Sequence, residues 1–367
     1  MKRRILQVNL DGTGGAFSLM YQIQMSLKNS YIFDFYWMGR FVQSEKLDNL
    51  RKMGCKFYEG NLRKNKVIGH LLLPFRFYLF LKKHPYDIVH INADLAYKQL
   101  LYALPAKVAG VKNIILHSHS SGVNGNHKLL KYFLHKLCRR SLNKVGDTFL
   151  SCSSLASKWM FTDTEKVTVI NNGVNLKKYK FNLKIRNEVR RELGVNNILL
   201  GTVGNLSYQK NPKFLIDLIK SLDSEGRYTL MFVGDGENRR EIEAYAKKNN
   251  VYEKCIFYGN SSNVASLLDA MDIFIMPSRF EGLPVSAVEA QASGLPCVFS
   301  DKITTEAKII SNCYFKSIDR NYKEWDMTIR KISKTPSFNR VLCSNEVKEK
   351  GFDIKDSAKK LLFIYSR

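Results

Sequence analysis

The feature that most constrains this chain is an alternation of short apolar segments with helical segments, which occurs twice along 367 residues. In the first half, strand-like segments fall at residues 4–9, 31–37, 86–92, 111–117 and 147–152. In the second half they fall at residues 197–203, 228–233, 255–258, 272–276 and 296–300. Strands separated by helices of this length predict parallel sheets with helices on both faces. We therefore predict an α/β protein of two doubly wound, Rossmann-like domains.

The point at which the pattern restarts sets the expected domain boundaries. We expect a first domain over residues 1–172, a linker over residues 173–196 and a second domain over residues 197–351. Residues 352–367 contain an amphipathic helix without a strand of its own. Open α/β sheets bind ligands at the carboxyl ends of their strands, so we expect the two domains to face each other across a ligand-binding cleft.

The start of the chain and its cysteines indicate a cytoplasmic protein. The first residues, MKRRILQVNL, lead directly into a strand, without the apolar region and cleavage site of a signal peptide. The longest apolar run, LLLPFRFYLFL at residues 71–81, is too short to span a bilayer. Seven cysteines, an odd number with no C-x-x-C pair, favour reduced thiols over a disulfide framework or a zinc site.

The net charge of +25 points to a polyanionic partner or to a solvated basic face. Residues 51–83 carry nine Lys or Arg side chains against the single Glu59, and they contain the apolar run at residues 71–81. Basic and apolar residues interleaved in this way are typical of an element at an anionic membrane surface. Nucleic acid is the other polyanion, but no zinc-finger, RRM or basic-zipper pattern occurs, so we do not expect a nucleic-acid partner.

Two groups of residues in the first half follow expected strands. Gly12, Gly14 and Gly15 lie between a strand and a helix, where glycines allow backbone N–H groups to approach a phosphate. A plain tight turn explains them equally well, because neither G-x-G-x-x-G nor GK[ST] is complete. His117 and His119 follow another strand, where a catalytic or substrate-binding role and a structural role are both open.

The stretch SRFEGLPVSAVEAQASG, residues 278–294, predicts a loop followed by a helix. Pro284 suits the first helical position, and Gly294 suits the position just past the helix end. Glu281 then lies in the loop, and Glu289 lies mid-helix at the edge of the apolar stripe. A carboxylate beside the core needs hydrogen-bonding partners, so Glu289 is either a ligand-binding or a tilted surface residue.

Lys210 lies at the turn after the strand-like segment 197–203, where an ammonium group can pair with a phosphate. No D-x-D motif occurs in the chain, so a carboxylate-held Mg²⁺ lacks its usual pair of ligands. This pattern favours a phosphate site neutralised by a side chain.

Taken in order, these segments resemble glycosyltransferase family four, whose members are retaining enzymes of the GT-B fold. The matching motifs run from DGTGGA, PYDIVHIN and HSHS to VINNGVN, GNLSYQKNP, VGDGE and MPSRFEGLPVSAVEAQASGLPCVFSD. The last of them contains the E-x7-E signature of the family, formed by Glu281 and Glu289. The chain is most similar to bacterial enzymes that extend capsule, exopolysaccharide or O-antigen repeat units, and its final helix resembles the one that crosses back onto the first domain in this fold.

The resemblance implies the site residues. The catalytic positions are His119 and Glu281, with His117 as an alternative because the register of the HSH motif is ambiguous. The donor-binding positions are Gly14, Gly15, Asn205, Lys210, Gly282, Leu283, Pro284 and Glu289.

The resemblance also implies what several of these residues do. Glu289 would bind the ribose hydroxyls of a nucleotide-sugar, and Lys210 would neutralise its diphosphate without a metal cofactor. Asn205 stands where the family usually has a second cation, an arginine. Arg279 could replace that cation.

The function implied is a metal-independent, retaining hexosyl or N-acetylhexosaminyl transferase at the inner face of the plasma membrane. It would move a sugar from a nucleotide donor, UDP-linked by expectation, to a polyprenyl-diphosphate-linked oligosaccharide. Two alternatives use the same fold: a UDP-sugar 2-epimerase, and a catalytically inactive partner subunit that the Asn205 substitution would fit.

Overall fold

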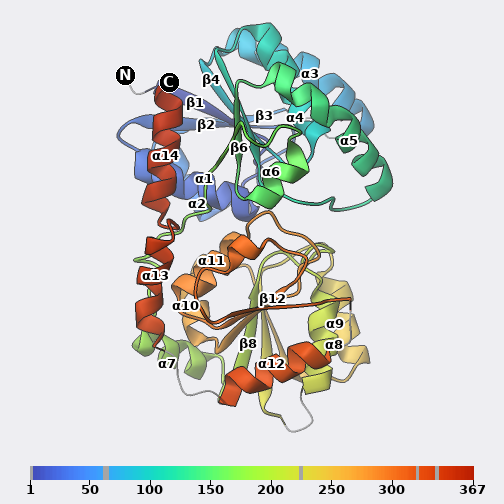
Figure 1. The fold of residues 1–367 in the computed structure, drawn as a ribbon, viewed down its shortest axis with the longest axis vertical. Helices are drawn as coiled ribbons and strands as arrows, with labels where there is room; N and C mark the ends of the chain where they lie inside the picture. The colour runs from blue at the N-terminus through green and yellow to red at the C-terminus, as the bar shows by residue number, and fades with distance from the viewer. Residues whose placement is uncertain (1–2, 61–65, 223–225, 320–321, 335–338) are drawn as a thin grey trace. The chain divides into compact units, whose positions relative to one another are not determined.

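The computed structural model describes the chain except residues 1–2, 61–65, 223–225, 320–321 and 335–338. It forms two compact units (Figure 1). The first unit contains Met1–Asn172 and Ile354–Arg367, and the second contains Gly173–Asp353.

In the described part of the first unit, seven parallel strands form one sheet in the order β3-β2-β1-β4-β5-β6-β7. The strands are β1 (Arg3–Val8), β2 (Tyr31–Trp37), β3 (Phe57–Glu59), β4 (Ile88–Ala93), β5 (Asn113–Ser118), β6 (Thr148–Ser151) and β7 (Val167–Val169). The strand order reverses between β1 and β4. Sheets of this type bind ligands at the carboxyl ends of the strands on either side of such a reversal.

Helices cover both faces of this sheet because successive side chains of a strand point to opposite faces, and both faces here carry apolar side chains. On β1, Ile5 packs in one core cluster with residues of α1 (Gly14–Leu27), α2 (Glu45–Lys52) and α14 (Ile354–Ser366). Leu6 and Val8 point to the other face and pack in a second cluster with residues of α3 (Lys66–Lys83), α4 (Ala96–Ala109) and α5 (Lys128–Val145). The short helix α6 (Ser154–Met160) follows β6.

The last helix, α14, is an integral part of the first core and packs against α1 (Figure 1). Leu361 is fully buried, and Tyr365 is 1% exposed. The Tyr31 hydroxyl donates a hydrogen bond to the backbone oxygen of Tyr365 at 3.1 Å. The end of the chain is therefore fixed against β2.

The second unit has, in its described residues, six parallel strands in the order β10-β9-β8-β11-β12-β13. They are β8 (Ile198–Val203), β9 (Tyr228–Val233), β10 (Cys255–Gly259), β11 (Ile273–Met276), β12 (Cys297–Ser300) and β13 (Cys313–Lys316). The helices are α7 (Leu183–Glu192), α8 (Pro212–Leu222), α9 (Arg239–Lys248), α10 (Val264–Ala270), α11 (Val285–Ala292), α12 (Lys323–Lys334) and α13 (Cys343–Glu349), with 3-10 turns at Tyr252–Lys254, Thr305–Ala307 and Arg340–Leu342. Here the order reverses between β8 and β11.

The segment expected as a linker, residues 173–196, lies within the second unit. Its helix α7 is attached there by Arg186, which donates hydrogen bonds to the backbone oxygens of Ala270 and Met271 and forms an ion pair with Asp272 at 2.5 Å. Polar side chains made this segment look like a linker, but its arginines reach the carbonyls at the end of α10.

The predicted architecture of two doubly wound α/β units is confirmed, and all ten predicted strands are present. The sequence missed β3, β7 and β13, each of which lies at the edge of a sheet. Edge strands are short and half-exposed, so they lack a continuous apolar run. Among the described residues, no helix combines the length and apolar character that crossing a bilayer requires.

Candidate functional site

Lys210 and Glu281 meet in the second unit, where the strand order reverses. Lys210 lies in the loop after β8, and Glu281 lies in the loop after the neighbouring strand β11. The Nζ atom of Lys210 is 2.8 Å from Oε1 of Glu281, and the two side chains are 21% and 9% exposed. The structure thus brings a predicted phosphate-binding cation and a predicted catalytic carboxylate together where such a sheet binds its ligand.

Glycines allow the loop after β8 to pack closely. Gly204 has a φ of +147°, and a Cβ there would lie 2.8 Å from Cε of Lys210. Gly234 has a φ of +128°, and a Cβ there would lie 2.3 Å from the backbone oxygen of Gly204. Larger residues at these two positions would push the loop, and Lys210 with it, out of place.

Arg279 lies beside the same loop. Its guanidinium donates a hydrogen bond to Oδ1 of Asn211 at 2.7 Å and stacks over the Tyr208 ring at 4.6 Å. Its backbone N–H donates to the oxygen of Gln209 at 2.8 Å. Asn205, the departure from the family pattern, is exposed. A second cation therefore lies beside the loop that carries Lys210, although it comes from a different position in the sequence.

Glu289 is nearly buried, with 8% exposure, in the middle of α11. Its Oε1 accepts a hydrogen bond from the Tyr179 hydroxyl at 2.5 Å. Burial, together with the charge of this carboxylate, raises the pKa of Tyr179 well above its ordinary value. The partner that a carboxylate in this position needs is present, but Tyr179 is 110 residues away in the sequence and no local pattern could identify it.

The loop before α11 differs slightly from the prediction. Pro284 has an extended backbone, with ψ at 122°, and is the N-cap of a helix that begins at Val285, so its prediction as the first helical residue was wrong by one position. The prediction for Gly294 is confirmed by its φ of +70° directly after the C-cap. Gly282 and Leu283 connect Glu281 to this helix, and Leu283 is 3% exposed. Helix α11 therefore begins four residues after Glu281, and the dipole at its N-terminus favours an anion there.

In the first unit, the glycine turn leads into α1. Gly14 is the first residue of the helix, with a φ of +76°, and a Cβ there would meet no atom within 4 Å. Gly14 and Gly15 are both exposed. Gly12 has a structural reason for being glycine, because a Cβ there would lie 2.9 Å from the backbone oxygen of Val42. Open space at a helix N-terminus fits the predicted approach of a phosphate.

Three histidines lie together: His90 within β4, His117 near the end of β5 and His119 just after it. The rings of His117 and His119 have centroids 3.9 Å apart, and Nε2 of His90 is 3.0 Å from Nδ1 of His117. His117 is fully buried, whereas His119 is partly exposed. Burial lowers the pKa of His119 to about 4 and that of His90 to about 3, so both rings are neutral at pH 7.

The predicted site residues thus form two groups, one in each unit. Within the described ranges, no group of three or more His, Cys, Asp or Glu side chains is arranged to hold a metal ion.

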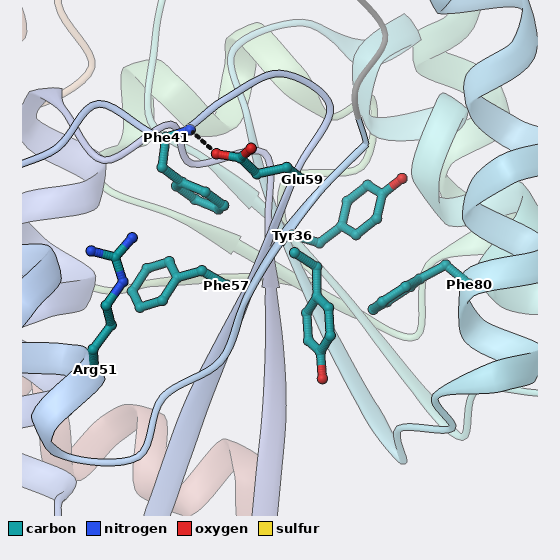
Figure 2. Close-up of a pocket in the computed structure, with 7 residues that line it drawn as sticks. Tyr36, Phe41, Arg51, Phe57, Glu59 and Phe80 are labelled. Atoms are coloured by element: carbon teal, nitrogen blue, oxygen red, sulfur yellow. Dashed lines mark hydrogen bonds between the residues drawn. The ribbon is translucent and has the colours of Figure 1, made fainter.

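A pocket of about 540 Å³ lies in the first unit at the carboxyl ends of β2 and β3. Figure 2 shows its mostly aromatic lining and its two charged residues, Arg51 and Glu59. Glu59 accepts a hydrogen bond from the backbone N–H of Phe41 at 2.9 Å, and the Arg51 guanidinium lies 5.3 Å from the centroid of the Phe57 ring. This pocket was not predicted from the sequence because β3 was not predicted.

Two helices of the first unit expose large apolar side chains beside basic ones. On α3 they are Leu71, Leu72, Phe75 and Leu79, within the segment predicted to meet a membrane. On α5 they are Leu129, Leu130, Tyr132, Phe133 and Leu137. α5 was not predicted to meet a membrane, although the pattern KLLKYFLHKLCRR carries the same mixture of apolar and basic residues.

Comparisons with known proteins agree with this geometry. Residues 45–178 match the family model for Glycosyltransferase Family 4, and residues 185–345 match the model for Glycosyl transferases group 1. A putative glycosyltransferase EpsF of Bacillus subtilis is 28% identical over 77% of this chain and 75% of its own length. The UDP-Gal:alpha-D-GlcNAc-diphosphoundecaprenol alpha-1,3-galactosyltransferase of Escherichia coli is 27% identical over 61% of this chain and 60% of its own length. The structure of Anabaena Alr3699/HepE in complex with UDP-glucose has a TM-score of 0.80 at 18% identity and covers 99% of both chains, which shows the same fold.

Proposed function

Because the chain belongs to the glycosyltransferases of family 4, we propose that it transfers a sugar from a UDP-linked donor to a lipid-linked oligosaccharide in bacterial surface polysaccharide synthesis. The observation that carries this proposal is the Lys210–Glu281 pair at the point where the strand order of the second sheet reverses. Two similar proteins support the substrates: the Anabaena protein is known in complex with UDP-glucose, and the E. coli enzyme acts on a sugar linked to diphosphoundecaprenol.

The donor binds the second unit through three kinds of contact. The Lys210 ammonium neutralises the diphosphate as a point charge, and the N-terminus of α11 adds its partial positive charge. The Glu289 carboxylate has about four lone-pair positions, so it can accept from the Tyr179 hydroxyl and from the ribose hydroxyls at the same time. The bond from Tyr179 orients it. Gly14 and Gly15 of the first unit are the remaining proposed donor-binding residues, through their backbone N–H groups.

The reaction exchanges one bond for another at the anomeric carbon of the donor sugar. The bond from that carbon to the diphosphate breaks, and the acceptor hydroxyl oxygen bonds to the carbon on the same face. The acceptor proton passes to the departing phosphate oxygen, so no protein nucleophile is needed. Lys210 and the helix N-terminus stabilise the charge that develops on this oxygen, which is the role we propose in place of a metal.

The proposed catalytic residues are His119 in the first unit and Glu281 in the second. His119 is the more exposed of the two adjacent histidines, which favours it over His117 as the residue nearest the reacting carbon. Its low pKa keeps it neutral, so it contacts the sugar by hydrogen bonding and carries no charge.

The acceptor binds the first unit. The exposed apolar side chains of α3 and α5, with the basic residues between them, fit the surface of an anionic membrane that carries the lipid anchor. The aromatic pocket at β2 and β3 opens at the same edge of the sheet as His119, since all strands of this sheet are parallel. Aromatic faces with a few charged groups suit the oligosaccharide part of the acceptor.

A transfer assay tests the function. The full chain is incubated with radiolabelled UDP-glucose, UDP-galactose or their N-acetylated forms, and with polyprenyl-diphosphate-linked N-acetylglucosamine in vesicles. We expect one donor to label the lipid, with retained configuration, and Lys210→Ala to abolish labelling. Epimerisation of the UDP-sugar without transfer would identify the epimerase instead, and the absence of both reactions across these donors would favour the inactive subunit.

A further inference from the structure

A closed network of buried side chains surrounds the first-unit histidines. It contains Gln7 on β1, His90 and Asn92 on β4, His117 on β5 and Tyr365 on α14, and it includes His119 just after β5. Each hydrogen bond in it restricts the next, so the position of every proton can be worked out from one fixed point.

The fixed point is the Asn92 amide. Its Nδ2 lies 3.2 Å from the backbone oxygen of His90, and a carbonyl only accepts, so the amide nitrogen must face this oxygen. The amide oxygen of Asn92 then faces Nε2 of His119 at 2.9 Å. An amide oxygen also only accepts. Neutral His119 therefore carries its proton on Nε2 and presents a lone pair on Nδ1.

The same amide fixes Gln7. Asn92 Nδ2 donates to Oε1 of Gln7 at 3.0 Å, so the amide nitrogen of Gln7 points to the Tyr365 hydroxyl at 3.3 Å and to Nδ1 of His90 at 3.4 Å. The Tyr365 hydroxyl, which accepts a hydrogen bond from Gln7, donates one through its own O–H to Nδ1 of His90 at 2.7 Å. His90 accepts at Nδ1 from both neighbours and therefore carries its proton on Nε2.

His90 passes this orientation to His117. Its Nε2–H donates to Nδ1 of His117 at 3.0 Å, so His117 carries its own proton on Nε2. That Nε2–H of His117 and the Nδ1 lone pair of His119 are both shielded from solvent, and among the described residues neither has a hydrogen-bond partner. The bonded nitrogen of each ring faces β4, so the unpartnered nitrogen of each points away from that strand.

We infer that Gln7, Asn92 and Tyr365 are positioning residues that fix the tautomers of His117 and His119, so that His117 offers a donor and His119 an acceptor to a hydroxyl group of the transferred sugar. A hydroxyl oxygen can accept from His117 while its proton is donated to His119. A phosphate has no proton for His119, and an ammonium group has no lone pair for His117. The pair therefore selects a neutral hydroxyl, and the identification of that hydroxyl as part of a donor sugar rests on the proposed function.

The ligand-free protein tests the tautomers directly. Long-range ¹H–¹⁵N correlation spectra of the full chain labelled in its histidine rings distinguish Nδ1–H from Nε2–H. We expect the Nε2–H form for His90, His117 and His119. A His117 ring that carries its proton on Nδ1 would overturn the inference.

The same spectra test the ligand. We expect UDP alone to leave the ring signals of His117 and His119 unchanged. The UDP-sugar that is transferred should shift the Nε2 signal of His117 and the Nδ1 signal of His119. UDP-glucose and UDP-galactose are the probes if the transferred sugar is not yet known. A bound UDP-sugar that shifts neither signal would contradict the inference, because a buried water would then bind the two nitrogens in place of the sugar. A protein that binds no UDP-sugar at all contradicts the proposed function, while the tautomers of the ligand-free protein still test the roles of Gln7, Asn92 and Tyr365.

Variants separate positioning from simple support. In Gln7→Glu the carboxylate only accepts hydrogen bonds, so the directions of the hydrogen bonds through His90 and His117 reverse. The protons of both rings move to Nδ1, and His117 no longer offers an Nε2–H donor. We expect kcat/KM for the UDP-sugar to fall about tenfold, the loss of one hydrogen bond, while Kd for UDP stays the same. Tyr31→Phe is the matched control, because it removes the hydrogen bond from the Tyr31 hydroxyl to the backbone oxygen of Tyr365 and leaves the network around the histidines intact.

If Gln7→Glu does not fold, Tyr365→Phe gives the second test. It removes the nearer donor to His90 and should give a mixture of His90 and His117 tautomers with reduced kcat/KM. Unchanged tautomers in both variants, or an equal loss of activity in Tyr31→Phe, would mean that these residues only support the helix.

Discussion

Individual residues of the second unit act through their immediate neighbours. Lys210 and Glu281 hold each other in a partly buried ion pair, and Glu289 is held by Tyr179. A donor diphosphate must compete for Lys210 with Glu281, so the pair keeps the ammonium group in place before the ligand arrives. None of these contacts joins residues close in sequence.

The first residue-scale prediction concerns Glu289. In Glu289→Gln the side chain keeps its size and can still accept from Tyr179, but charge-assisted bonds to ribose become neutral ones. Hydrogen bonds to a charged group contribute about 1.5–3 kcal/mol, and the neutral amide keeps only part of this binding free energy. We therefore expect Kd for UDP, measured by calorimetry, to rise about tenfold. An unchanged melting temperature is the control for folding, and an unchanged Kd would show that Glu289 does not touch the nucleotide.

At the scale of elements, the ends of helices decide where the loops lie. Gly294 ends α11 with a φ of +70°, and a Cβ there would lie 2.4 Å from the backbone oxygen of Arg340. Gly194 ends α7 with a φ of +65°, and a Cβ there would meet nothing within 4 Å. The two glycines share a backbone conformation and differ in their surroundings, so together they form a natural comparison.

We expect Gly194→Ala to lower the free energy of unfolding by about 1 kcal/mol, the cost of the left-handed conformation alone. Gly294→Ala should cost at least about 2 kcal/mol, because backbone atoms must also move. Urea unfolding of both variants measures the difference. Equal costs would show that the loop around Arg340 gives way freely.

A second element-scale prediction concerns α5. Replacing its exposed Leu130 and Phe133 by Glu removes apolar area and adds charge that an anionic membrane repels. We expect the double variant to lose most of its sedimentation with vesicles containing phosphatidylglycerol. The control is Met327→Glu, at a residue of α12 that is 71% exposed in the second unit. Equal binding of the double variant and the wild type would exclude α5 as the membrane contact.

The central strands and long helices of the fold could be predicted because burial on both faces leaves apolar runs in the sequence. The edge strands could not, since β3 and β13 mix apolar residues with Glu59 and Lys316. Glu281, Glu289 and Lys210 could be identified from their motifs. Their partner Tyr179, and the link from Tyr365 to His90, could not, because these hydrogen bonds join residues 110 and 275 positions apart.

At the scale of the whole molecule, the two units should respond differently to acid. Burial lowers the pKa of His119 and His135 to about 4, below the ordinary value near 6.5. The unfolded chain therefore binds protons first, so stability of the first unit is lost as pH falls from about 6.5 towards 4. Burial raises the pKa of Asp269 in the second unit to about 6, and its contribution is instead lost as pH rises through that value.

Hydrogen exchange followed by mass spectrometry at pH 7 and pH 5, corrected for intrinsic rates, measures both units in one chain. We expect protection of β4 and β5 to fall at pH 5, while protection of α10 holds or increases. Asp269→Asn should remove the pH response of α10. Loss of protection in both units alike would show that general charge repulsion dominates.

We propose that the second unit binds a UDP-sugar through Lys210 without a metal, and thermal unfolding tests this binding most directly. The full chain is heated in EDTA with UDP, GDP, ADP or their sugars, beside the Lys210→Ala and Lys213→Ala variants. A ligand at 100 times its Kd stabilises a protein by about 2.7 kcal/mol. We expect UDP and one of its sugars to raise Tm in the wild type and in Lys213→Ala, and to have little effect in Lys210→Ala. No shift with any nucleotide, or an equal shift in Lys210→Ala, would contradict the account.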